Sequence, residues 1–117
     1  MKQMNDGTKY SQQDIVLIPF PYSDLTGAKQ RPALVLSNKL VKGEDLICCL
    51  ITSKKTEECI TIEQKDCEEG ELPFSSFIKC YRLFTIHRRI IKKKMCKLNN
   101  KLFDKVVSEL VQHIQRN

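Results

Sequence analysis

Short apolar runs separated by polar turn residues fill most of the chain. The runs are rich in Ile, Val and Leu, which is typical of β-strands, and Pro19 closes the first of them because proline cannot donate to a strand ladder. Links of about eight residues favour antiparallel neighbours. Together the runs predict a small barrel or curled sheet. The predicted strands are 14–20, 31–37, 46–52, 59–62, 76–81 with a continuation or restart at 83–86, and a short strand within 90–98, with loops at 22–29 and 64–71.

The hydrophobic period changes near the C-terminus. Apolar residues there recur at the spacing of one helix face, which predicts an amphipathic helix over about 100–115. Asn99 is the expected N-cap, since an Asn side chain can accept a hydrogen bond from the first turn. The third strand, 46–52, is apolar throughout, so both of its faces are expected to be buried. The helical stripe consists of Leu102, Phe103, Val106, Val107, Leu110, Val111 and Ile114.

Length, charge and cysteine content narrow the class of protein. The 117 residues fit a single domain at 14–117 after a polar leader at 1–13. No apolar run is long enough to span a membrane, and a cytoplasmic protein is expected. The net charge of +6 suits RNA, DNA or an acidic protein, although solubility alone also explains it. The six cysteines form no C-x-x-C pair and no zinc spacing with the histidines, so buried thiols in a reducing compartment are expected rather than a metal site.

Arg31 is the first candidate functional residue. It precedes Pro32 and an apolar strand, which would hold its backbone while the guanidinium points outward. Guanidinium groups bind phosphate oxygens through paired hydrogen bonds. The alternative is an ordinary charge at a strand edge, which the pattern alone favours by about two to one.

Other candidates are weaker. Thr52 and Ser53 end an apolar strand, where their hydroxyls could face a ligand or bond the backbone. Residues 88–97 hold six basic residues in ten, a density that favours contact with a polyanion over a solvated face. His87 could act as a general base because histidine titrates near neutral pH, but a lone histidine is more often structural. Asp24 lies close before Arg31 and could share its site.

Residues 14–20, then 24–37 with Arg31 and Pro32, then 50–53 with Thr52 and Ser53, resemble the MazF/PemK toxin family, and the PemK-like branch most closely. The resemblance continues through 76–79, 83–86 and the helix. It implies a mainly β, SH3-like barrel of about five to seven strands with a C-terminal helix, usually a homodimer. It also implies the toxin of a type II toxin–antitoxin pair, a metal-independent and cofactor-free endoribonuclease for single-stranded mRNA, neutralised by an acidic antitoxin.

The family pattern also implies roles for individual residues. Arg31 and Thr52 match the positions tied to cleavage, in which an RNA 2′-OH attacks the adjacent phosphorus and leaves a 2′,3′-cyclic phosphate. A fixed guanidinium would stabilise the charge that develops on the phosphoryl oxygens. RNA contacts are expected from Asp24, Lys29, Gln30, Ser53, Lys79 and Arg82.

The chain departs from the family pattern in the loop before Arg31, where some members carry an acidic residue or a histidine, and again in the strand at 76–81. The better-studied branch carries an Arg-x-Asp pair where Lys79 and Tyr81 stand here. Lysine lacks the bidentate fork of arginine, and a phenol is no carboxylate. A non-catalytic barrel that binds RNA or an acidic protein therefore stays open as an alternative. A DNA-binding or peptide-binding module is a third possibility, disfavoured by the absence of Trp and the scarcity of aromatic residues for a groove.

Overall fold

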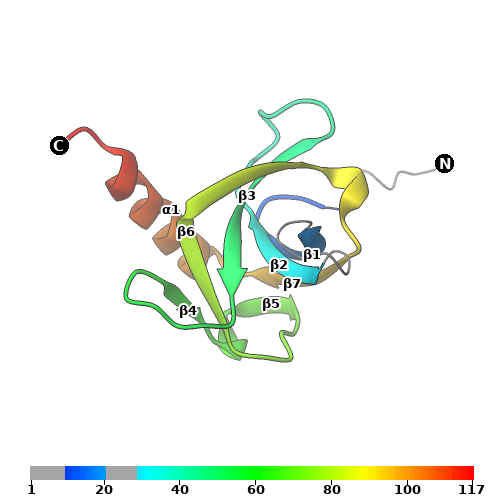
Figure 1. The fold of residues 1–117 in the computed structure, drawn as a ribbon, viewed down its shortest axis with the longest axis horizontal. Helices are drawn as coiled ribbons and strands as arrows, with labels where there is room; N and C mark the ends of the chain where they lie inside the picture. The colour runs from blue at the N-terminus through cyan, green and yellow to red at the C-terminus, as the bar shows by residue number, and fades with distance from the viewer. Residues whose placement is uncertain (1–9, 21–28) are drawn as a thin grey trace.

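A curled, seven-stranded antiparallel sheet with one C-terminal helix makes up the fold (Figure 1). The computed structural model describes residues 10–20 and 29–117. Neighbouring strands follow the order β4-β6-β3-β2-β1-β7-β5. The mainly β class, the antiparallel pairing and the terminal helix are therefore confirmed. The elements are β1 (Asp14–Phe20), β2 (Lys29–Val35), β3 (Asp45–Thr52), β4 (Ile60–Ile62), η2 (Gln64–Asp66), β5 (Cys67–Gly70), β6 (Ser76–His87), η3 (Arg88–Ile90), β7 (Lys93–Leu98) and α1 (Asn100–Ile114).

Both faces of the central strands are buried, as the apolar third strand predicted. Consecutive residues contribute to opposite hydrophobic clusters: Cys48 packs with Val16 and Ile18, whereas Cys49 belongs to the cluster that includes the helix residues. A strand buried on two faces has no polar alternation, which explains the continuous apolar runs. Burial raises the pKa of the Cys48 thiol to about 12, so this cysteine behaves as a small hydrophobic residue.

Helix α1 covers one face of the sheet and packs against β6 (Figure 1). The Asn99 side chain accepts a hydrogen bond of 2.8 Å from the Leu102 N–H, which confirms the predicted cap. The first part of the stripe, including Phe103 and Val106, is buried in the core. The later residues Val111 and Ile114 are exposed, because the helix runs on past the sheet.

The predicted boundaries were wrong in three places. The second strand is shifted toward the N-terminus, because β1 continues to Phe20 and its ladder extends β2 back to Lys29. The predicted loop at 64–71 contains η2 and strand β5, whose pairing with β7 overrides its acidic, non-alternating sequence. The strand expected within 90–98 begins only at Lys93. The continuation at 83–86 is confirmed, since β6 is one strand.

The last residues before β1 are hydrogen-bonded to the sheet. The Gln13 N–H donates to the Val35 carbonyl at 3.0 Å, and its side chain donates to the Leu98 carbonyl at 2.8 Å. These contacts join the start of β1 to β2 and β7. In the described part of the chain, no helix is both long and apolar enough to cross a bilayer.

Candidate functional site

The ladder between β2 and β3 stops where the Arg31-Pro32 pair begins. Pairing covers Ala33 with Leu50 through Val35 with Cys48, and goes no further. Pro32 has no N–H to donate to the next position. Continued in the same register, the ladder would have placed Arg31 opposite Thr52. The proline therefore ends the pairing between the two strands where both candidate catalytic residues stand.

An irregularity in β6 brings a second arginine to the same place. Along β3, Cys49 pairs with Leu83 but the next residue, Leu50, pairs with Lys79. The intervening residues of β6, which include Arg82, are left out of the ladder. Bulges of this kind redirect side chains and occur frequently next to active sites. Arg82 is exposed as a result and lies beside the open end of β3.

A hollow of about 290 Å³ lies at this junction. Its lining carries three cationic side chains, two hydroxyls and the apolar floor of β3. Among the described residues, neither the Arg31 side chain nor the Arg82 side chain has a hydrogen-bond or ion-pair partner. Unneutralised cations around a small concave surface attract anions such as phosphate. The lining residues are Arg31, Leu50, Ile51, Thr52, Ser53, Lys54 and Arg82.

The Thr52 hydroxyl is oriented by the backbone. Its Oγ1 accepts a hydrogen bond of 3.1 Å from the Lys54 N–H. The oxygen is thereby engaged as an acceptor, and its own hydrogen can still be donated to an oxygen in the hollow. The ordinary strand-end role and the ligand-facing role are thus compatible in this side chain.

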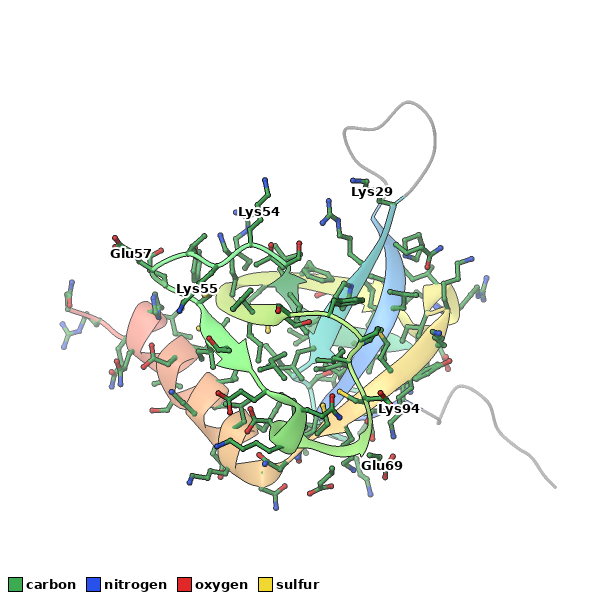
Figure 2. The ribbon with its side chains drawn as sticks, turned by 90° about the horizontal axis from the view of Figure 1, so that it is seen from below. Lys29, Lys54, Lys55, Glu57, Glu69 and Lys94 are labelled. Carbon is green, nitrogen blue, oxygen red and sulfur yellow. The ribbon has the colours of Figure 1, made fainter. Side chains whose placement is uncertain are left out.

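The remaining predicted RNA-binding residues are distributed unevenly. Lys29 and Gln30 are exposed on β2, on the same strand as Arg31. Lys79 lies opposite Leu50 on β6 but is not among the described residues that line the hollow. Asp24 lies outside the described residues. Lys54 was not predicted, although its position after Thr52-Ser53 could have been noticed; Figure 2 shows it on the same side of the molecule as Lys29.

The two histidines and Tyr81 are engaged in structural contacts. His87 accepts a hydrogen bond from the Arg89 N–H at 3.0 Å and so caps η3. His113 stacks on Tyr81 with a ring-centroid separation of 5.5 Å. The Tyr81 hydroxyl lies 3.4 Å from a carboxylate oxygen of Glu58. None of the three lines the hollow among the described residues.

Part of the basic run at 88–97 is engaged within the fold. The Arg88 guanidinium donates to the Tyr10 carbonyl at 2.9 Å. Lys94 bridges the carboxylates of Asp14 and Glu69, at 3.3 and 2.9 Å. Two of its six cations are thus bound within the fold. The density of charge along the run could not show these contacts, because the groups that bind Arg88 and Lys94 lie far away in sequence.

A sequence model of a known family matches residues 11–114, which is most of the chain. The chain belongs to the PemK-like, MazF-like toxin family of type II toxin–antitoxin systems. The family predicted from the sequence is therefore confirmed, and the matched residues include both Arg31 and Thr52. Among curated proteins, none matches this sequence significantly.

Solved structures with the same fold include several toxins. An endoribonuclease from a mycobacterial species, in complex with its cognate antitoxin, has a TM-score of 0.74 at 11% identity, covering 92% of this chain and 97% of that one. MazF in the MazE–MazF complex of Deinococcus radiodurans has a TM-score of 0.73 at 18% identity, covering 92% and 98%. The Mycobacterium tuberculosis toxin MazF-mt6 has a TM-score of 0.66 at 16% identity, covering 89% and 98%. At these identities the likeness establishes the fold.

Proposed function

We propose that this toxin is an endoribonuclease that cleaves single-stranded mRNA without a metal ion, with Arg31 and Thr52 as its catalytic residues. The observation that carries the proposal is the hollow in which the Arg31 guanidinium and the Thr52 hydroxyl meet at the end of the β2–β3 ladder. Family membership supports the same activity.

The proposed reaction needs no group beyond the RNA and the protein. The 2′-OH attacks the adjacent phosphorus, the 5′-oxygen leaves, and a 2′,3′-cyclic phosphate remains. Negative charge develops on the phosphoryl oxygens, where Arg31 supplies paired donors and Thr52 a further one. Arg31 stays protonated, so the proton of the 2′-OH passes to a different acceptor.

RNA on either side of the scissile phosphate would meet further cations. Lys54 and Arg82 line the same hollow, and Ser53 adds a hydroxyl. Lys29 and Gln30 extend along β2 beyond Arg31. Contacts to phosphates from such groups give affinity that weakens as salt concentration rises.

An acidic antitoxin and a second copy of the chain are the proposed protein partners, and the cytoplasm the proposed location. Antitoxin complexes of structurally similar toxins support the first partner. A groove of about 630 Å³ adjoins the hollow, shares Leu50 and Arg82 with it, and exposes Leu83 and Ile90. Exposed apolar side chains around a concave surface are typical of protein interfaces.

The test is cleavage of a single-stranded RNA by purified protein in EDTA, with product ends identified by mass spectrometry. We expect 2′,3′-cyclic phosphate ends, and a rate loss on the order of 100-fold or more for Arg31→Ala. Lys101→Ala is the matched control, because it removes one charge from an exposed position on α1. Full activity of Arg31→Ala would disprove the assignment.

The second candidate function is binding of RNA or an acidic protein without cleavage. It is favoured by Tyr81, which is stacked on His113 where the better-studied branch has a carboxylate. Binding that persists in a protein with no cleavage on any RNA tested would support this alternative. Cleavage that depends on Arg31 would exclude it.

A further inference from the structure

Cys67 and Cys96 form a thiol pair remote from the hollow. They lie on β5 and β7, which are adjacent and antiparallel. The Cys67 thiol donates to the Cys96 sulfur, with the two Sγ atoms 3.2 Å apart. Both residues are free thiols. No other pair among the six cysteines, all of which lie in described strands and loops, shares a hydrogen bond.

The two strands are held together next to this pair. Lys94 of β7 donates to Glu69 of β5 at 2.9 Å (Figure 2). Gly70 has a φ of +73°, and a side chain there would collide with the carbonyl oxygen of Met95. Close packing of the two backbones therefore keeps the two sulfur atoms near one another. Forming a bond between them would cost little further conformational entropy.

The two thiols differ in accessibility. Cys67 is half-buried, whereas Cys96 is only 1% exposed. Burial raises the pKa of Cys96, and the contact with Cys67 and the charge of Asp14 raise it further. Cys96 thus remains a protonated thiol at neutral pH, and a small oxidant reaches Cys67 first.

We propose that Cys67 and Cys96 are an oxidative modification site that closes into an intramolecular disulfide in the presence of a peroxide. The Cys67 sulfur takes one oxygen from hydrogen peroxide and becomes a sulfenic acid, with release of water. The Cys96 thiol then gives its proton to the departing hydroxyl of the sulfenic acid while its sulfur attacks the Cys67 sulfur, so the S–S bond forms, the S–O bond breaks and the oxygen leaves as a second water. In sum, two thiols lose two electrons and two protons, and one peroxide is reduced to two waters.

The disulfide would tie β5 to β7 and enclose β6, η3 and the loops between them. A cross-link across a long loop stabilises the fold chiefly by restricting the unfolded chain. Its effect is therefore expected in unfolding rather than in the hollow. The inference does not depend on the proposed RNA cleavage.

The experiment treats the full-length protein with hydrogen peroxide, alkylates the remaining thiols and maps them by peptide mass spectrometry. We expect a Cys67–Cys96 linked peptide and a mass loss of about two hydrogens. We also expect a rise in Tm of roughly 5 °C or more, reversed by dithiothreitol. Cys67→Ser should lose both effects.

Cys59→Ser is the matched control, because Cys59 is also half-buried. Its thiol donates a hydrogen bond of 2.9 Å to the Thr56 carbonyl rather than to another thiol. That variant should still form the linked peptide. A sulfinic acid at Cys67 without linkage, a disulfide between two molecules, or a linkage through another cysteine would each overturn the proposal. Cys96→Ala should also lose the linked peptide and the rise in Tm. If this change to a buried side chain prevents folding, Cys67→Ser, which changes a half-buried one, still decides the matter.

Discussion

Lys94 and the two arginines of the hollow, Arg31 and Arg82, lie in different parts of the same sheet. They differ in whether carboxylates neutralise their charges. Lys94 sits on the β1–β7–β5 side and is held by two carboxylates. Arg31 and Arg82 lie where β2, β3 and β6 separate, and neither has an ionic partner among the described residues. In Figure 2, Lys54 of the hollow and Lys94 lie on opposite sides of the molecule.

The difference lies in the carboxylates within reach of each cation. Lys94 pairs with Val16 of β1 beside a register shift in the β1–β7 ladder, and its ammonium neutralises Asp14, whose side chain is fully buried. Around Arg31 the ladder has ended at Pro32 and the partner strand is bulged, so its guanidinium faces the hollow. Both cations thus lie beside an irregular stretch of ladder, but Lys94 is engaged by two carboxylates and stabilises the fold, whereas Arg31 is available to a ligand.

Replacing Lys94 by Met is expected to have the largest effect on stability. Within residues 10–20 and 29–117, the buried Asp14 carboxylate would keep only the Ser11 N–H, at 2.9 Å, as a hydrogen-bond donor. Leaving a buried charge without its partner costs about 3 kcal/mol in the free energy of unfolding. Urea denaturation measures this loss, and RNA cleavage per folded molecule should be unchanged.

Lys93→Met is the control for this experiment, since Lys93 is an exposed neighbour on the same strand. Adding Asp14→Asn to Lys94→Met should recover part of the loss, because the uncompensated charge is removed. A loss below about 1 kcal/mol for Lys94→Met would show that the pair contributes no more than a surface ion pair. The contrast between the two groups would then fail.

Most of the fold could be predicted from the sequence, because its strands are short, apolar and closed by prolines, glycines or polar loops. Strand β5 could not, since its Cys-Glu-Glu-Gly sequence has no strand pattern. Its conformation is set by pairing with β7 and by the ion pair from Glu69. Contacts of this kind join residues far apart in sequence, and no local pattern records them.

The candidate site could be predicted only in part. The strand pattern alone favoured an ordinary edge charge for Arg31, and the family resemblance selected Arg31 and Thr52, which both line the hollow at the end of the β2–β3 ladder. Arg82 was expected from the family pattern, and the bulge in β6 brings it to the hollow; Lys54 was not expected, because its place there depends on the turn after β3. The density of charge at 88–97 gave no sign that Arg88 and Lys94 are engaged within the fold, because their partners lie far away in sequence.

Arg31→Lys tests whether the hollow needs a fork of donors or only a positive charge. Lysine keeps the charge but offers a single ammonium in place of two parallel N–H groups. We expect a rate loss of about tenfold, equivalent to about 1.4 kcal/mol of transition-state stabilisation. Single-turnover cleavage kinetics measure it, and Tm should not change. A rate equal to that of the unaltered protein would mean that the hollow supplies charge alone.

Thr52→Val should have a smaller effect on cleavage. Valine has a similar shape but cannot donate to a phosphate oxygen, and one neutral hydrogen bond contributes about 1 kcal/mol, or roughly fivefold in rate. Thr52→Ser keeps the hydroxyl and should retain most of the activity. If both variants cleave at the original rate, the Thr52 hydroxyl only accepts the Lys54 N–H.

Glu69 offers the smallest effect and a check by pH on the partnered group. The hydrogen bond from Lys94 and its charge lower the pKa of Glu69 below its ordinary value of about 4.5. A lowered pKa stabilises the fold above that value, and the contribution is lost as pH falls through the pKa of the folded state. For Lys94, burial lowers the pKa, but the bond to Glu69 and the charge of Asp14 outweigh it and raise the pKa overall. The pair is therefore charged throughout the neutral range.

The Tm difference between the unaltered protein and Glu69→Gln should be constant from pH 6 to 8, within about 1 °C, and should disappear in acid. A difference that persists in acid would mean that Glu69 acts through packing rather than through its charge.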